Sequence, residues 1–299
     1  MNDQQQDKPN VVLEQKKAAD KAFTLPLRIL RWMLPGDRIR TFVYLNFLAK
    51  PRKFLHRALN GFYRFDQVYE ILRGFRREFH GPFSILEFGT AQGYAFAKLL
   101  YATRYLKMED DVVVHGFDSF EGLSTTDDEA DQGLFSNDWI EGSYAASYET
   151  LRDYCEQRKY RNYRIHKGFF EDSITPEVIE QLQVEQPILV WIDCDYYTSS
   201  ATVFERLLPI LPTGCVVYFD DLEFNFGSRF TGEARLVHEV NSGKFGDDLE
   251  LILDRDLSWN SMYVYRFIRH SDKSVQYRPI YTDPGTPVAR SIQDGSPLP

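Results

Sequence analysis

Cysteine is scarce in this chain of 299 residues, and its three cysteines follow no spacing typical of a metal site or a disulfide framework. Cys194 and Cys215 lie inside apolar, strand-like runs, whereas Cys155 lies in a polar stretch. We therefore expect buried, reduced thiols, as in a reducing cytosol.

Long apolar runs are also missing, since no stretch approaches the ~20 residues that a transmembrane helix needs. The polar start MNDQQQDKPN is not followed by an apolar segment, so we expect no signal peptide and a cytoplasmic location. No internal repeat is present. A hydrophobic content of 43% and an aromatic content of 15% indicate a folded, globular protein.

Charge is distributed unevenly along the chain. Residues 1–80 contain 16 Lys and Arg against 8 Asp and Glu, so this part carries +8 while the remainder carries −17. An acidic body argues against a nucleic-acid substrate. The basic N-terminal region could contact a membrane surface or an acidic partner, but we expect it to pack on its own domain or on a partner subunit of a homodimer.

The hydrophobic pattern changes its period near residue 80. Before it, residues 24–60 mix apolar residues with arginine between prolines, which predicts short amphipathic helices, and Phe65, Val68, Leu72 and Phe75 continue at helical spacing. After it, apolar runs alternate with helical patterns. We expect a flexible leader at 1–20, a helical basic region at 21–78, the main domain at 79–270 and a C-terminal tail at 271–299.

The alternation in the main domain predicts an α/β fold with a Rossmann-like, doubly wound sheet of seven strands. Strand-like runs occur at 84–89, 112–118, 162–168, 187–193, 215–220, 249–254 and 261–268. Helical patterns lie at about 92–106, 145–158, 175–183, 198–210 and 229–242. The last two strands have no helix between them, so we expect the sheet to close with an antiparallel strand. The long acidic loop 119–143 is a candidate lid.

Ligands of a doubly wound sheet bind beyond the carboxyl ends of its strands, and several of these ends carry acids. The first run continues into the turn ILEFGTAQGYAF, with Glu87 preceding Gly89 and Gly93. Its spacing departs from the dinucleotide fingerprint, and a carboxylate there would attract a cationic ligand and repel a pyrophosphate. Asp118 ends the second run, where a ribose diol is usually bound, and Asp172 and Ser173 follow the third, where they could read an adenine amino group. Each of these acids could instead be a solvated turn residue.

Five segments together resemble the macrocin O-methyltransferase family of class I S-adenosylmethionine-dependent methyltransferases: ILEFGTAQGYAF, GFDSFEGL, GFFEDSI, WIDCDYYTSS and YFDDLE. The similarity spans roughly residues 80–225 and implies the seven-stranded methyltransferase fold, with an N-terminal helical extension here. It implies a sugar hydroxyl of a natural product as the acceptor. The candidate cofactor-binding residues are Glu87, Gly89, Thr90, Gly93, Asp118, Ser119, Gly168, Asp172 and Ser173.

Two runs end in paired carboxylates, at Asp193 with Asp195 and at Asp220 with Asp221. Carboxylates at adjacent strand ends repel one another unless a cation neutralises them, and an all-oxygen site suits Mg²⁺. The resemblance implies that Asp193, Asp220 and Asp221 hold this metal. Strand alternation turns Cys194 away from the cluster, which disfavours zinc. The alternative is that such aspartates cap the following helix, and this is the role that we expect for Asp195.

The proton acceptor is the least determined part of the site. His238 shares a helical face with polar residues, so we expect a surface histidine, and we expect His115 and His166 to lie in the core or to line the cleft. We therefore expect metal-assisted deprotonation of the substrate hydroxyl, with Asp193 as the catalytic residue that accepts the proton. Tyr196 and Tyr197 are candidates for the lining of the acceptor pocket.

Two other functions are compatible with such a sheet. One is a nicotinamide-dependent oxidoreductase, which the acid at Glu87 and the altered glycine pattern disfavour. The other is a non-catalytic, methyltransferase-like scaffold that binds a partner or a membrane through the basic N-terminal region.

Overall fold

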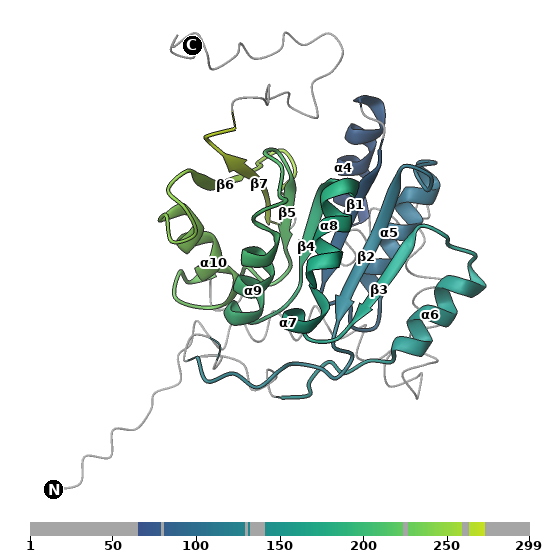
Figure 1. Cartoon of the computed structure of the whole chain (residues 1–299), viewed down its shortest axis with the longest axis horizontal. Coiled ribbons are helices and arrows are strands. Elements are labelled where there is room, and N and C mark those ends of the chain that lie inside the picture. The colour runs from purple at the N-terminus through teal and green to yellow at the C-terminus, as the bar shows by residue number, and fades with distance from the viewer. Residues whose placement is uncertain are drawn as a thin grey trace, which may run out of the picture.

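The structure of the chain, a computed structural model, describes residues 65–78, 81–128, 131, 141–223, 227–258 and 263–272 (Figure 1). The expected leader, the tail beyond residue 272, most of the basic region and much of the candidate lid therefore lie outside the described residues. None of the described helices is long and apolar enough to cross a membrane.

Seven strands of the described chain form one sheet in the order β3-β2-β1-β4-β5-β7-β6. They are β1 (Phe83–Phe88), β2 (Val112–Asp118), β3 (Tyr163–Lys167), β4 (Pro187–Ile192), β5 (Val216–Phe219), β6 (Leu249–Leu253) and β7 (Tyr263–Arg269). The first five pair in parallel, and β7 pairs antiparallel with both β5 and β6. This confirms the expected sheet, including the antiparallel strand that closes it.

All of the described helices except the short α7, which was not predicted, follow the predicted patterns with small shifts at their ends. They are α4 (Phe65–Glu78), α5 (Tyr94–Tyr105), α6 (Tyr148–Gln157), α7 (Phe170–Ser173), α8 (Pro176–Glu185), α9 (Tyr197–Leu207) and α10 (Gly232–Asn241). Local chemistry explains two of the starts, because the side chains of Ser147 and Thr175 accept hydrogen bonds from the first turns of α6 and α8.

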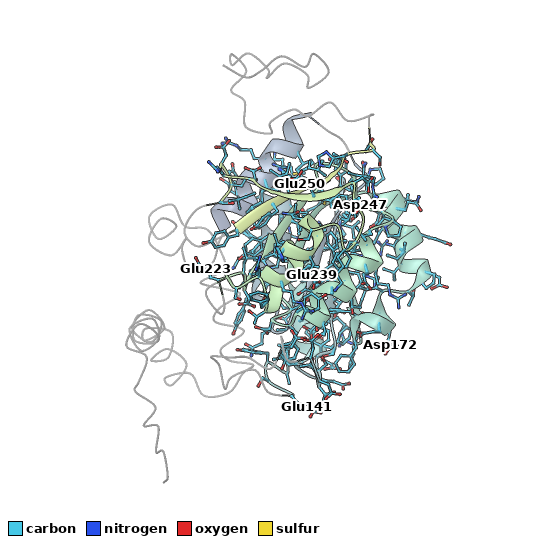
Figure 2. All side chains as sticks on the ribbon, turned by 90° about the vertical axis from the view of Figure 1, so that its left-hand side faces the viewer. Glu141, Asp172, Glu223, Glu239, Asp247 and Glu250 are labelled. Atoms are coloured by element: carbon cyan, nitrogen blue, oxygen red, sulfur yellow. The ribbon has the colours of Figure 1, made fainter. Side chains whose placement is uncertain are left out.

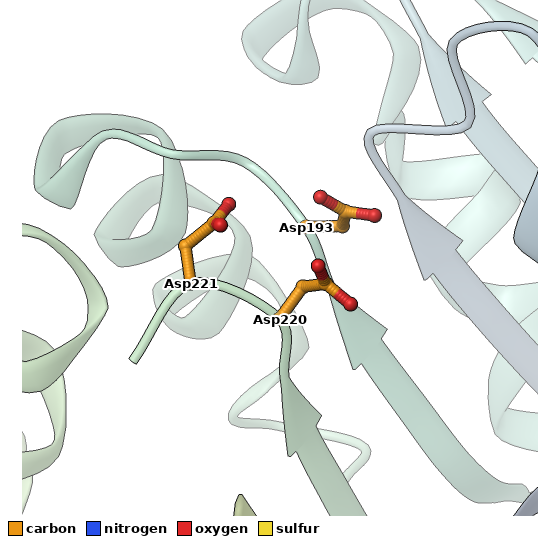
Figure 3. Close-up of side chains that lie close together, drawn as sticks. All are labelled: Asp193, Asp220 and Asp221. Atoms are coloured by element: carbon orange, nitrogen blue, oxygen red, sulfur yellow. The ribbon is translucent and has the colours of Figure 1, made fainter. Parts of the chain in front are cut away.

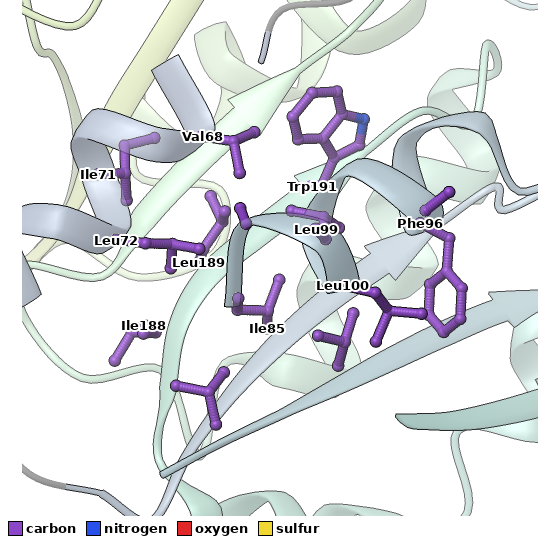
Figure 4. Packing of buried hydrophobic residues seen from close by; sticks show 14 of the residues in the cluster. Val68, Ile71, Leu72, Ile85, Phe96, Leu99, Leu100, Ile188, Leu189 and Trp191 are labelled. Carbon is purple, nitrogen blue, oxygen red and sulfur yellow. The ribbon is translucent and has the colours of Figure 1, made fainter. Parts of the chain in front are cut away.

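Two apolar layers cover the two faces of the sheet, which is why β1, β4 and β5 are buried along their whole length. Side chains of α4, α5 and α6 form one layer, where Val68 and Leu72 pack with Leu99 and Trp191 (Figure 4). Side chains of α8, α9 and α10 form the other layer. Burial of Val68 and Leu72 confirms the helical spacing expected for residues 65–75 and attaches α4 to the domain.

Candidate functional site

The hydrogen-bond ladder of the sheet continues one residue beyond three neighbouring strands and aligns their ends. Gly89 donates its N–H to Phe117, Asp193 donates to Phe88, and Asp220 donates to Ile192. Successive side chains of a strand point to opposite faces, so Glu87, Asp193 and Asp220 share the face that also carries Trp191 and Tyr218. The sheet thereby places three acids from β1, β4 and β5 at one edge, on one side.

Three aspartates form a cluster at this edge, as the resemblance implied. Asp193, Asp220 and Asp221 each offer a carboxylate oxygen, and these oxygens lie within 4.8 Å of one another (Figure 3). We call these residues the three-aspartate cluster. Its donor set is purely oxygen, which fits a hard divalent cation such as Mg²⁺.

Two buried residues, Tyr218 of β5 and Glu233 of α10, form hydrogen bonds with the cluster. The Tyr218 hydroxyl donates to Asp220 Oδ1 at 2.7 Å, and the Asp221 N–H donates to Glu233 Oε2 at 2.9 Å. Both Tyr218 and Glu233 are only 1% exposed. Burial raises the pKa of Glu233 well above its usual value, and the charges of Asp221 and Asp193 raise it further. We had not predicted a role for either residue, since a strand tyrosine and a first-turn acid are common in any α/β protein.

Glu87 is a buried acid with an unsatisfied oxygen. It is 1% exposed, and its Oε2 has no hydrogen-bond partner within the described part of the chain. Burial raises its pKa well above the usual value, the charge of Asp193 raises it further, and Lys98 partly offsets both. A cationic ligand that donated hydrogen bonds to Oε2 would relieve this unfavourable burial.

Gly89 permits the close approach of the end of β1 to the backbone of Asp193. Its φ is +91°, and a Cβ at this position would lie 1.7 Å from the backbone oxygen of Asp193. Gly93, the N-cap residue of α5, has φ +78°, and a Cβ there would lie 2.3 Å from the Leu151 side chain. Thr90 is buried between them in the same turn. The turn therefore requires glycine at both predicted positions.

Asp118 lies at the end of β2 and faces the same turn. Its Oδ2 accepts the Ala91 N–H at 2.7 Å and its Oδ1 accepts the Phe120 N–H at 2.5 Å. Burial raises the pKa of Asp118, although these two hydrogen bonds lower it in part. The neighbouring Ser119 hydroxyl is used inside its own turn, where it accepts the Glu121 N–H and donates to the Gly122 carbonyl.

The end of β3 brings the predicted adenine-binding residues next to Asp118. Gly168 donates its N–H to the Asp118 carbonyl at 2.9 Å and has φ +138°. A Cβ on Gly168 would lie 3.7 Å from the Ser173 Cβ. Ser173 is buried and its hydroxyl has no partner among the described residues, whereas Asp172 is exposed on α7 (Figure 2). Ser173 thus offers an unused hydrogen-bonding group beside the β2 and β3 ends.

The role predicted for Asp195 is wrong, because α9 is capped from elsewhere. The N-cap residue is Tyr196, whose side chain does not cap the helix, and Asp195 lies in the preceding turn at φ +59°. The buried carboxylate of Asp131, from the loop 119–143, instead accepts the N–H groups of Tyr197 and Thr198 and the Thr198 hydroxyl. One part of the candidate lid is therefore fixed to the start of α9.

Tyr197 has a different role from the one that we expected. Its hydroxyl donates to Glu239 and accepts a hydrogen bond from Lys244, and the Arg235 guanidinium lies 3.9 Å from its ring centroid. The side chain is thus occupied by a packed ionic cluster between α9 and α10 and does not line an acceptor pocket. Phe230 lies within the helical pattern predicted at 229–242, but it precedes α10 and is 66% exposed.

The histidines lie where the sequence indicated. His238 is exposed on α10. His115 is fully buried, with Nε2 2.7 Å from Glu185 Oε2 and Nδ1 3.0 Å from His166 Nε2. Burial lowers the pKa of His166 to about 4, and its ring stacks on Phe117 with centroids 4.2 Å apart. All three cysteines are free and buried, as expected.

The sequence matches one family model, and the fold resembles those of solved methyltransferase structures. Residues 86–222 match the family model described as "Methyltransferase domain". The solved structure of the calicheamicin methyltransferase CalS11 is 18% identical with a TM-score of 0.56, covering 77% of this chain and 90% of that chain. The fold is the Rossmann-like methyltransferase fold. The O-methyltransferase NovP also has it, at 20% identity and a TM-score of 0.53 over 68% of this chain and 79% of that chain. No curated protein matches the sequence.

In this methyltransferase fold, the predicted residues meet at the carboxyl edge of β1 to β5, the edge where ligands of doubly wound sheets bind. Glu87 with its unsatisfied oxygen fits the ammonium group of an amino-acid moiety. The three-aspartate cluster fits a divalent cation. The family match and the fold support a methyltransferase.

Proposed function

We propose that this chain is an S-adenosylmethionine-dependent, Mg²⁺-assisted O-methyltransferase that acts on a hydroxyl of a small molecule, specifically a sugar of a natural product. The observation that carries the proposal is the position of Glu87 beside the three-aspartate cluster on one face of the sheet edge. Glu87 suits the amino group of the cofactor, and the three-aspartate cluster beside it suits a metal ion that would bind the hydroxyl of the methyl acceptor. The two structural relatives, a calicheamicin methyltransferase and an O-methyltransferase, support the choice of chemistry.

The cofactor would be held by the ends of three strands. Glu87 Oε2 would accept hydrogen bonds from the ammonium group, and the Gly89 turn would admit the amino-acid moiety. Asp118 would accept hydrogen bonds from the ribose hydroxyls through lone pairs that its two backbone donors leave free. Ser173 and Asp172 would contact the adenine. When bound, S-adenosylmethionine supplies an electrophilic methyl group.

The three-aspartate cluster would bind and orient the acceptor hydroxyl. Mg²⁺ supplies a Lewis acid that lowers the pKa of a coordinated hydroxyl. Asp193 interacts electrostatically with Glu87 and also belongs to the cluster, so its carboxylate lies between the cofactor and acceptor subsites. We therefore assign the acceptance of the hydroxyl proton to Asp193. Holding both reactants in line provides the remaining rate enhancement.

Calorimetry tests the cofactor, and Mn²⁺ binding tests the metal. S-adenosylhomocysteine should bind the full-length wild-type protein, whereas NADH should not, since the buried Glu87 carboxylate repels a pyrophosphate. Mn²⁺, followed by electron paramagnetic resonance, should bind the wild type and be lost from Asp193→Asn. NADH binding without S-adenosylhomocysteine binding would favour the oxidoreductase instead. Labelled methyl transfer to a panel of glycosides, with and without EDTA, then identifies the acceptor.

A further inference from the structure

Glu233 is a buried acid beside the three-aspartate cluster without being part of it. It lies in the first turn of α10, 12 residues beyond Asp221, and is 1% exposed. Its oxygens are not among those that lie within 4.8 Å of one another in the cluster. One oxygen accepts the Asp221 N–H at 2.9 Å, and the other has no hydrogen-bond partner in the described chain.

The local backbone directs Glu233 at the end of β5. Gly232, the first residue of α10, has φ +53°, and a Cβ there would lie 3.3 Å from the carbonyl oxygen of Asp195. Glycine at this position therefore allows α10 to begin against the turn that joins β4 to α9. An acid in the first helical turn is favourable for the helix dipole, but an exposed acid would serve that purpose without the cost of burial. The burial of Glu233 calls for a further explanation.

The Asp221 peptide is the first one beyond β5 that the sheet does not fix. The preceding N–H, of Asp220, still bonds to Ile192, and the Asp220 carboxylate also accepts the Tyr218 hydroxyl. The Asp221 N–H is not part of the hydrogen-bond ladder of the sheet and donates to Glu233 Oε2 instead. Without this hydrogen bond, rotation of the 220–221 peptide would change the direction of the Asp221 side chain, which Asp220 and Asp193 repel.

We propose that Glu233 is a positioning residue of the three-aspartate cluster: its hydrogen bond to the Asp221 N–H fixes Asp221 relative to Asp193 and Asp220 and thereby sets the affinity of the site for a divalent cation. This inference rests on the proposed metal-assisted function. Residues that orient metal ligands typically contribute a factor of about 10 to 100 in metal affinity.

Two neutral substitutions separate the hydrogen bond from the charge. Glu233→Gln keeps an acceptor oxygen for the Asp221 N–H, whereas Glu233→Met keeps most of the buried volume and removes the acceptor. Both variants lose the same charge, so the difference between them reports the hydrogen bond alone. Glu239→Gln, on the same helix and paired with Lys244 and Tyr197, is the control for a lost charge on α10 (Figure 2).

Mn²⁺ titration of the full-length proteins, followed by electron paramagnetic resonance, is the measurement. We expect Glu233→Met to weaken Mn²⁺ binding roughly 10- to 100-fold, Glu233→Gln to stay within about 3-fold of wild type, and Glu239→Gln to be unchanged. Calorimetric binding of S-adenosylhomocysteine checks that each variant is folded. Equal Mn²⁺ affinities of the folded Met and Gln variants would overturn the positioning role. Failure of the wild type itself to bind Mn²⁺ would instead refute the metal function, and the inference with it.

Discussion

Asp131 offers a strong test of how the candidate lid is attached to the domain. Its buried carboxylate accepts two N–H groups of the first turn of α9, those of Tyr197 and Thr198, and two hydroxyls, those of Thr198 and Thr126. Asp131→Ala removes the cap of α9, which costs about 1–2 kcal/mol. It also leaves the buried Tyr197 N–H without its acceptor, which costs roughly 1–3 kcal/mol more.

The expected destabilisation by Asp131→Ala is therefore about 2–5 kcal/mol. In a domain of this size, 1 kcal/mol shifts the melting temperature by ~2–4 °C, so calorimetry should show a decrease of about 4–20 °C. Asp131→Asn keeps a good capping residue and should lose less than half as much. The control is Asp128→Ala, from the same loop, whose partly exposed ion pair with Arg235 at 3.3 Å contributes about 0–1 kcal/mol. Equal melting temperatures of Asp131→Ala and Asp128→Ala would refute the cap.

Three other substitutions test the edge of the sheet and the histidine pair. Gly89→Ala should destabilise the fold by at least ~2 kcal/mol in urea denaturation and abolish S-adenosylhomocysteine binding, because its Cβ would overlap the Asp193 carbonyl; an unchanged midpoint would contradict this. Glu87→Gln should retain the fold and weaken S-adenosylhomocysteine binding at least 10-fold in calorimetry, and equal affinity would exclude Glu87 from the amino-acid subsite. His166 is neutral in the folded state, with a pKa of about 4 against 6.5 ordinarily, so protonation favours the unfolded chain and stability falls as the pH drops from 6.5 to 4. His166→Phe should make that fall shallower in urea titrations, and an unchanged pH profile would show that His166 is not its source.

The fold could be predicted from the sequence because its strands are covered on both faces. Continuous apolar runs such as PILVWI can be buried only between two helical layers, and the helical patterns between them supply those layers. The missing helix between the last two runs predicted the antiparallel β7, because a crossover between parallel strands needs a long connection. The helix ends differ by a few residues, since capping depends on side chains that periodicity does not report.

The contacts that support the site could not be predicted in the same way. The cap of α9 comes from Asp131, 66 residues before Tyr197, whereas the sequence offered a local candidate in Asp195. The tyrosine expected to line a pocket forms its hydrogen bonds with Glu239 and Lys244 of a later segment. In both cases, several residues of the sequence could form the hydrogen bond, and the tertiary structure determines which of them lies within hydrogen-bonding distance.

The difference between Asp193 and Asp195 shows where sequence periodicity stops being informative. Asp193 is the last residue that the ladder holds, through its N–H to Phe88, so strand alternation still determines that it shares a face with Trp191 and Glu87. Cys194 takes the opposite side and packs in the other apolar layer. At Asp195 the backbone turns to φ +59°, and alternation no longer assigns a side. A carboxylate can therefore be placed in the three-aspartate cluster from its sequence position only while its backbone remains in the sheet. Asp221 lies one residue beyond the ladder, and its N–H donates to Glu233 Oε2 instead of to a neighbouring strand.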